Sequence, residues 1–219
     1  MRLKKAHAIL KKVAGKDFSQ IFTPQQLNQI SNNTTNKGVV GQVLELSLGL
    51  TNNSNTLDFV DGELKTNSCD KLGKPKETVA ITQISSEIDQ ILSVDRFKSS
   101  KLYKKITKIL FVLVYKERSL PVEQWRIVDI IYINLKNPFN MKILRQLKKD
   151  YSEIRRQMKE QIEVGSDGLL HTANGKYLQI RTKDSAPYSP IFSNIYDREI
   201  SSKNFAFYFQ KSFVLELQK

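Results

Sequence analysis

The sequence predicts an α/β protein with a central mixed β-sheet flanked by helices. Two apolar runs rich in β-branched residues, residues 106–115 and 126–135, fit buried strands. Residues 139–161 repeat apolar side chains at helical spacing, which predicts a long amphipathic helix. Strand and helix patterns alternate without an internal repeat, and this order favours the α/β class.

The N-terminal part of the chain is predicted to be helical. Within residues 1–30 apolar side chains recur at helical spacing, and Thr23 with Pro24 fits the cap and first turn of a second short helix. A polar loop follows over residues 31–37. A largely apolar helical pattern returns over residues 38–50.

Short strands are predicted next. Residues 58–60 and 63–66 fit two strands on either side of a tight turn at Asp61-Gly62. Residues 67–76 form a loop containing glycine and proline, and residues 77–84 alternate as a strand.

The C-terminal third adds a hairpin and an aromatic strand. The hairpin covers residues 169–180 and turns at Asn174-Gly175, and the aromatic strand covers residues 205–209. Strand alternation places the phenylalanines of this strand on one face and Tyr208, exposed, on the other.

Composition bounds the class of protein. The chain has 219 residues, of which 40% are hydrophobic and 26% charged, so it suits one large domain or two small ones and is not collagen-like, coiled-coil or disordered. A single cysteine, Cys69, excludes a disulfide framework and a zinc site with several thiolates. The apolar run at residues 109–115 is too short to span a bilayer, and Lys11 and Lys12 interrupt any signal peptide. We expect a soluble, reduced protein in the cytoplasm, away from membranes.

The net charge of +13 indicates a nucleic-acid partner, although a basic surface can also serve solubility. Residues 96–159 hold seventeen Lys or Arg against five Asp or Glu, so nearly all the surplus lies in one central block. Phosphate binding requires concentrated charge, and this block includes the candidate DNA contacts Lys101 and Lys104.

Asp58, Glu63 and Lys65 form the candidate catalytic group. On a strand, Glu63 and Lys65 project to the same face, while Asp58 can approach across the turn. Two carboxylates suit Mg²⁺, and a lysine can orient or help to deprotonate water and stabilise a pentacoordinate phosphate. The pattern predicts metal-dependent phosphodiester hydrolysis.

The same string also arises by chance, and its charges then form a solvated ion pair. Glu45 lies in an apolar helical stretch, where a charge needs a partner or a ligand unless it faces the polar edge. The two histidines, His7 and His171, are too few and too far apart for histidine-based nuclease chemistry. No phosphate-binding loop motif of NTPases is present.

Five collinear blocks resemble the MutH family of mismatch-repair endonucleases, from about residue 36 to residue 215. The blocks are residues 36–45 (NKGVVGQVLE), 58–66 with 72–78 (DF, GELKT, LGKP, ET), 105–121, 175–181 (GKYLQIR) and 207–213 (FYFQKSF). Their shared order is far more specific than the carboxylate and lysine string alone.

The resemblance implies a restriction-endonuclease-like core in one endonuclease domain of two lobes that form a DNA cleft. About residues 1–90 would carry the catalytic carboxylates, and residues 91–219 the basic block and the base-reading motifs. It implies Mg²⁺-dependent nicking of the unmethylated strand at GATC, acting on double-stranded DNA as a monomer with MutL and MutS as candidate partners.

The resemblance also implies roles for single residues. Glu45, Asp58 and Glu63 match metal-binding carboxylates, Lys65 the catalytic lysine and Lys105 a basic residue near the active site. The implied DNA-binding residues, together with those of the basic block, are Lys37, Lys101, Lys104, Arg181, Lys183, Tyr208 and Lys211, with Tyr208 sensing the adenine.

Three departures from the family pattern keep other functions open. The interval from Asp58 to Glu63 is two residues short, Thr182 replaces a proline, and residues 1–35 match nothing. One alternative is a type II restriction endonuclease that cuts both strands at GATC. The other is a non-catalytic DNA-binding module on the same fold, which the intact Asp58, Glu63 and Lys65 disfavour.

Overall fold

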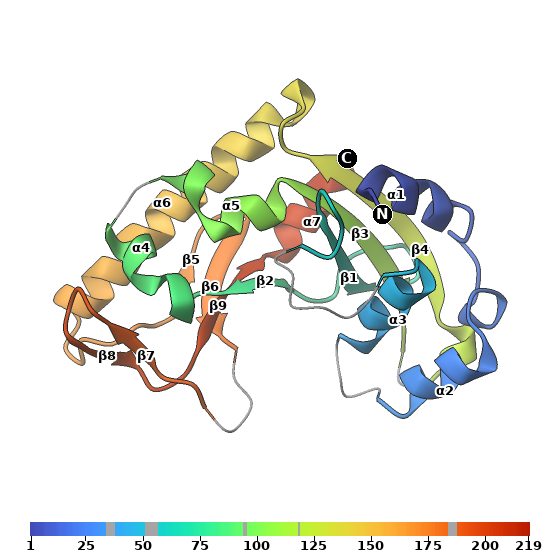
Figure 1. Ribbon diagram of the computed structural model, residues 1–219, viewed down its shortest axis with the longest axis horizontal. Coiled ribbons are helices and arrows are strands. Elements are labelled where there is room, and N and C mark those ends of the chain that lie inside the picture. The colour runs from blue at the N-terminus through green and yellow to red at the C-terminus, as the bar shows by residue number, and fades with distance from the viewer. Residues whose placement is uncertain (34–37, 51–56, 94–95, 118, 184–187) are drawn as a thin grey trace. The chain divides into compact units, whose positions relative to one another are not determined.

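In this computed structural model the chain passes back and forth between two units, because strands far apart in the sequence pair with one another (Figure 1). The structure describes all residues except 34–37, 51–56, 94–95, 118 and 184–187. One unit contains Met1–Val79, Thr107–Asn134 and Leu217–Lys219, and the other Ala80–Ile106 and Leu135–Glu216. The predicted assignment of separate functions to lobes divided near residue 90 stays a prediction.

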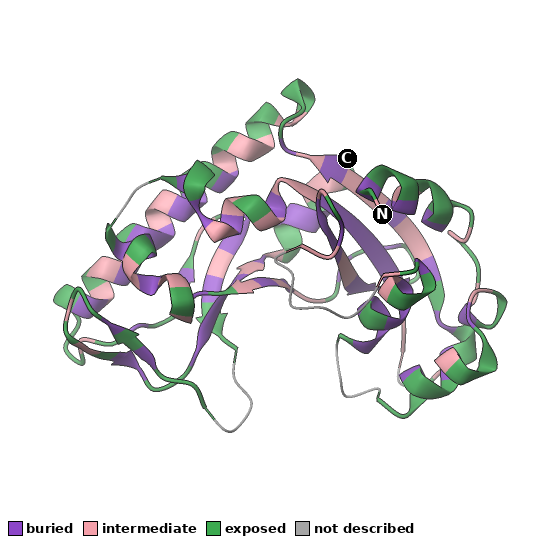
Figure 2. Cartoon of the chain, viewed as in Figure 1, coloured by how far each residue is buried: buried purple, intermediate pink, exposed green. Residues whose placement is uncertain are grey.

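The first unit is built on a three-stranded mixed sheet in the order β1-β3-β4. Strand β1 (Glu63–Cys69) runs parallel to β3 (Lys108–Tyr115), which pairs antiparallel with β4 (Arg126–Asn134). Strand β3 is buried from its second residue to its last, as its apolar run predicts for a central strand (Figure 2). Both predicted strands are therefore present, and with them the mixed sheet. Strand β4 lies at the edge of this sheet and is only partly buried, at Ile127, Ile130 and Ile133, so its predicted full burial is wrong.

Helices cover this sheet. Helix α1 (Leu3–Lys11) packs on β4 and β3, α3 (Val39–Ser47) packs on β1, and α2 (Pro24–Ser31) packs on α3. The Thr23 hydroxyl caps α2 by accepting from the Gln26 N–H at 3.3 Å, and Pro24 occupies its first turn, as predicted. Short 3₁₀ helices at Phe18–Gln20 and Val122–Gln124 complete the unit.

The second unit has its own antiparallel pairings. Its four-stranded sheet has the order β2-β9-β6-β5, and β7 pairs with β8. The strands are β2 (Val79–Gln83), β5 (Ala173–Asn174), β6 (Leu178–Thr182), β7 (Ile191–Ser193), β8 (Arg198–Ser201) and β9 (Phe205–Phe209).

The predicted long helix is α6 (Met141–Glu163), which buries Leu147, Tyr151, Ile154, Met158 and Ile162 at helical spacing and packs on β5 and β6. The other helices are α4 (Ile88–Ser93), α5 (Lys101–Ile106) and α7 (Lys211–Leu217), with 3₁₀ turns at Ser85–Glu87, Phe97–Ser99 and Pro138–Asn140. None of the described helices is long and apolar enough to cross a membrane.

Three local predictions need correction. Residues 58–60 make a single bridge, Phe59 to Gly62, because β1 finds its strand partner in β3. That pairing extends to Cys69 opposite Tyr115, so β1 continues into the predicted loop. The hairpin turns over residues 175–177, after the predicted Asn174, which belongs to the first strand, and that strand starts only at Ala173.

Candidate active site

A tight turn delivers the chain into β1. The Phe59 N–H donates to the Gly62 carbonyl at 3.0 Å, which closes the predicted turn. A Cβ atom on Gly62 would lie 2.6 Å from the Lys108 carbonyl oxygen, so only glycine allows the turn to approach β3 this closely. Asp61 fixes the turn by accepting from the Leu3 N–H at 2.8 Å and from Lys108 Nζ at 2.9 Å.

Glu63 and Lys65 follow the turn as the first and third residues of β1. Their side chains lie together, as expected for alternate strand residues, and Lys65 Nζ donates to Glu63 Oε2 at 2.6 Å. The Glu63 side chain is fully buried, whereas the Lys65 side chain keeps 20% of its surface exposed. Glu63 therefore holds the ammonium of a lysine whose side chain is only partly exposed.

Asp58 joins this pair from the turn segment. Its Oδ2 atom accepts from the Leu64 N–H at 2.9 Å and lies 3.9 Å from Lys65 Nζ. Burial alone would lower the pKa of Lys65, but the charges of Glu63 and Asp58 outweigh it and hold this pKa above its ordinary value. The structure thus brings Asp58, Glu63 and Lys65 together around one ammonium group.

Glu45 faces the same charges from α3. Burial, together with the negative charges of Asp58 and Glu63, raises the pKa of Glu45 to about 7, although Lys65 acts in the opposite direction. Its neighbour Leu46 is exposed, so Glu45 lies at the border between the buried and solvent faces of the helix. A carboxyl group in this position would be more easily ionised if a further cation were present.

Within the described residues, no three His, Cys, Asp or Glu side chains converge into a group that could hold a metal ion. The carboxylates of Asp58 and Glu63 instead converge on the Lys65 ammonium. Both are hard oxygen donors, so their chemistry suits Mg²⁺, and the assignment of Glu45 as a third ligand stays a prediction.

A second predicted group lies on the paired strands β6 and β9 of the other unit. Phe205, Phe207 and Phe209 are buried, as predicted, but Tyr208 is half-buried and not exposed, and Ala206 on its face of the strand is buried as well. The Arg181 guanidinium carbon lies 5.1 Å from the centre of the Tyr208 ring, a cation–π contact. Burial raises the pKa of the Tyr208 hydroxyl despite Arg181, so the phenol remains a neutral donor and acceptor.

The other predicted basic residues have separate positions. Lys183 is exposed just after β6, where its N–H donates to the Asn204 carbonyl at 2.9 Å, and Lys211 is exposed at the start of α7. On α5, Lys104 is exposed and Lys105 is half-buried. Lys37 lies outside the described residues.

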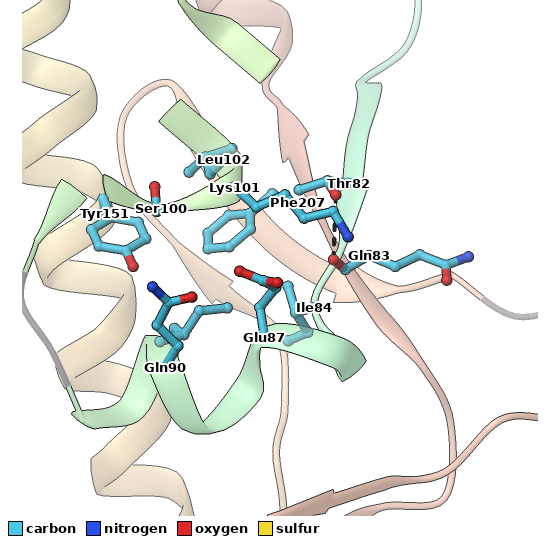
Figure 3. A pocket seen from close by; sticks show the side chains of 11 residues that line it. Thr82, Gln83, Ile84, Glu87, Gln90, Ser100, Lys101, Leu102, Tyr151 and Phe207 are labelled. Atoms are coloured by element: carbon cyan, nitrogen blue, oxygen red, sulfur yellow. Dashed lines mark hydrogen bonds between the residues drawn. The ribbon is translucent and has the colours of Figure 1, made fainter. Parts of the chain in front are cut away.

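A small hollow that opens to solvent lies beside α5 in the same unit (Figure 3). Its floor is apolar, with Ile84, Leu102 and Phe207, and Glu87 and Lys101 contribute polar groups. Lys101 Nζ donates to Ser86 Oγ at 3.4 Å. Of the predicted site residues, only Lys101 lines this hollow. The hollow is therefore not lined by the candidate catalytic residues.

Sequence reasoning missed the role of the N-terminal helix. The Leu3 backbone binds Asp61, and the Leu3 side chain is buried in the core beneath the sheet that carries Glu63 and Lys65. Residues 1–31 thus belong to the unit that holds the candidate active site. The only local signal of this contact was the presence of Asp61 in the turn. The turn sequence does not indicate which backbone N–H the Asp61 carboxylate binds.

Known proteins resemble the part of the chain that holds the candidate active site. A family model described as "DNA mismatch repair enzyme MutH" matches residues 48–150, which include Asp58, Glu63 and Lys65. A DNA mismatch repair protein MutH of Shewanella baltica is 32% identical over 184 residues, which cover 83% of this chain and 76% of that protein.

Two further relatives carry the same name. The protein of Shewanella oneidensis is 31% identical over 176 residues, covering 78% of this chain and 73% of its own length. The protein of Shigella flexneri is 31% identical over 168 residues, covering 74% of this chain and 65% of its own length.

Proposed function

Since the chain belongs to the MutH family of DNA mismatch repair enzymes, we propose that it is a Mg²⁺-dependent endonuclease that nicks the unmethylated strand of DNA at GATC. The observation that carries this proposal is the Asp58, Glu63 and Lys65 group at the start of β1. A buried glutamate, a second carboxylate and a protonated lysine within 4 Å are the groups that phosphodiester hydrolysis needs.

The donor atoms fit a hard divalent cation. Asp58 and Glu63 would hold Mg²⁺, with Glu45 as the candidate third carboxylate, and the bound ion would activate water and neutralise charge on the phosphate. The pKa of Glu45 is raised to about 7 first by burial and then by the negative charge of Asp58, so a cation here would favour its ionised form.

Lys65 would act as an electrostatic group. Its pKa lies above the ordinary value, so at neutral pH it keeps its proton and cannot serve as a general base in this state. Held by Glu63 Oε2, the ammonium can donate to an attacking water or to a phosphate oxygen that gains negative charge.

Arg181 and Tyr208 would read the base sequence. Arginine pairs with the major-groove edge of guanine, and a neutral tyrosine hydroxyl can detect the amino group of adenine. Lysines such as Lys37, Lys104, Lys183 and Lys211 would bind phosphates. We expect the enzyme to act in the cytoplasm on double-stranded DNA, as a monomer with MutL and MutS as partners.

The test is incubation of a GATC plasmid with Mg²⁺, followed by separation of nicked, linear and intact DNA. The native protein, with a mismatch-repair activator present, should produce nicked circles. Glu63→Gln and Lys65→Met should lose at least a hundredfold in rate while they retain DNA affinity, because each removes transition-state stabilisation alone.

Lys11→Ala is the matched control, because it removes a lysine from the same unit and breaks an exposed ion pair with Asp129 at 3.3 Å. It should cut at the native rate. Cleavage by Glu63→Gln at that rate would remove the site assignment. Rapid linear product from the protein alone would instead identify a restriction endonuclease, and binding without any cutting a non-catalytic module.

A further inference from the structure

The turn that joins β5 to β6, residues 175–178, has a partner for every backbone N–H group. The Gly175 N–H donates to the Leu178 carbonyl at 2.8 Å. The next three N–H groups, of Lys176, Tyr177 and Leu178, donate to the carboxylate of Asp150 at 3.0, 2.5 and 3.0 Å. One side chain of α6 therefore binds three consecutive peptide groups of the turn.

The carbonyl groups of the turn are also bound. Gln210 Nε2 donates to the Gly175 and Leu178 carbonyls at 2.5 and 3.2 Å, and the Gln210 N–H donates to that of Tyr177 at 2.7 Å. Ser212 Oγ donates to the Lys176 carbonyl at 2.7 Å. A surface turn commonly leaves such groups to water, so this turn is held unusually firmly in one conformation.

Asp150 is suited to this role by its burial. Its exposed fraction is 2%, and a carboxylate so placed is stable only with several donors, which here include Gln146 Nε2 at 2.7 Å. A Cβ atom on Gly175 would lie 2.5 Å from the Asp150 carboxyl carbon. The carboxylate and the turn therefore fit together only because residue 175 is glycine.

The consequence is the register of β6. Leu178 ends the turn and begins the strand, opposite Phe209 of β9. Because side chains alternate along a strand, a slip of one residue would exchange the buried Ile180 with the exposed Arg181. Strand β5 has two residues and cannot fix this register alone.

We propose that Asp150 is a positioning residue that fixes the register of β6 against β9 and thereby sets DNA sequence preference through Arg181 and Tyr208. This inference rests on the proposed function. Asp150 is buried beneath the turn, so it acts through the peptide groups that it binds.

The experiment compares the native protein with Asp150→Asn, Gly175→Ala and Gln157→Ala. The first replaces an acceptor oxygen by an amide that faces N–H donors, and the second pushes the turn away from Asp150. Gln157 is the matched control, because it lies on the same helix and binds both backbone groups of Asn174 in the same hairpin at 3.0 Å. It does not contact the turn's N–H groups that Asp150 binds.

Two quantities are measured: the ratio of affinities for a GATC duplex and a scrambled duplex, and amide exchange in β6. Asp150→Asn and Gly175→Ala should each lose about ten- to a hundredfold of the affinity ratio, the value of one base contact, with unchanged affinity for the scrambled duplex. Amide exchange of β6 should accelerate in both. Gln157→Ala should match the native protein in both quantities.

Either variant suffices if the other fails to fold. A native affinity ratio in a folded Asp150→Asn or Gly175→Ala protein would overturn the positioning role, even if its melting temperature fell. Lack of any GATC preference in the native protein would instead overturn the proposed function, and this inference with it. The first failure appears only in the variants, so the two are distinguishable.

Discussion

Replacing Asp61 by alanine should destabilise the unit that carries the candidate active site by about 2–4 kcal/mol. The Asp61 carboxylate accepts from the Leu3 N–H at 2.8 Å and from Lys108 Nζ at 2.9 Å. A hydrogen bond to a charged group contributes roughly 1.5–3 kcal/mol. The two side chains of the ion pair are 26% and 27% exposed, so solvent reduces its share to about 1 kcal/mol.

The acid dependence of this contribution has a definite sign. Burial alone would raise the pKa of Asp61, but the hydrogen bonds from Leu3 and Lys108 outweigh it and lower this pKa. Because the pKa of Asp61 is lower in the folded state, its carboxylate stabilises the folded protein in full at any pH above its unfolded-state pKa of about 3.9. This stabilisation is lost as the pH falls through the folded-state pKa. The difference between the native protein and Asp61→Asn should therefore stay constant from about pH 7 to 5 and shrink below about pH 4.

Urea unfolding followed by Trp125 fluorescence is the suitable assay. Trp125 is the only tryptophan of the chain, and it is buried in the core of the same unit as Asp61. Asp61→Asn retains an acceptor for the Leu3 N–H, so its free energy of unfolding should fall by about 1 kcal/mol. Lys11→Ala breaks only an exposed ion pair, so its free energy of unfolding should fall by less than about 1 kcal/mol. An unfolding midpoint for Asp61→Ala no lower than that of Lys11→Ala would refute the reasoning.

Two further predictions concern DNA. If about six phosphates are neutralised, the logarithm of the DNA affinity should fall against the logarithm of the salt concentration with a slope of about −5. Lys104→Ala should reduce the magnitude of that slope by about one. A slope near zero would show that the basic block does not bind DNA phosphates. With hemimethylated GATC duplexes the enzyme should nick only the unmethylated strand, because N6-methylation adds bulk at the edge that Tyr208 would contact, at a cost of about 1–3 kcal/mol. Strand-resolved cleavage should show Tyr208→Ala blunting this preference more than it slows cutting of unmodified DNA, and equal cutting of both strands by the native protein would exclude the role.

Local patterns predicted most of the secondary structure. The apolar run of β3 needs burial on both faces, and the spacing along α6 allows only a helix with one buried stripe. Thr23 and Pro24 mark the start of α2 because their chemistry acts within one turn. These signals lie within a few residues, so one sequence suffices to find them.

Strand partners were harder to predict, because pairing depends on residues far along the chain. A tight turn between residues 58–60 and β1 favoured a hairpin, yet β1 pairs in parallel with β3. The buried, β-branched β3 offers β1 more apolar contact than three residues before the turn can. Tertiary packing thus replaced the locally favoured hairpin by a single bridge.

The candidate catalytic group was only partly predictable. The two-residue period of a strand places Glu63 beside Lys65, and the structure has them 2.6 Å apart. The approach of Asp58 depends on its hydrogen bond to the Leu64 N–H, which no residue type signals. Strand periodicity therefore predicts the first pair, and the tight turn predicts that Asp58 can approach it. Only the structure shows the hydrogen bond that holds Asp58 there.

Asp61 and Asp150 share a property that hides them from sequence reasoning. Each binds backbone N–H groups, 58 residues away for Leu3 and 26 to 28 residues away for the turn after β5, and a backbone group carries no residue signature. Each does, however, leave a trace in a nearby glycine. A Cβ atom on Gly62 would meet the Lys108 carbonyl at 2.6 Å, and one on Gly175 would meet the carboxyl of Asp150 at 2.5 Å. A glycine in a turn next to a strand therefore indicates a close approach. The residue that holds the turn should then be sought beside the glycine, as with Asp61, or at the partner of the approach, as with Asp150.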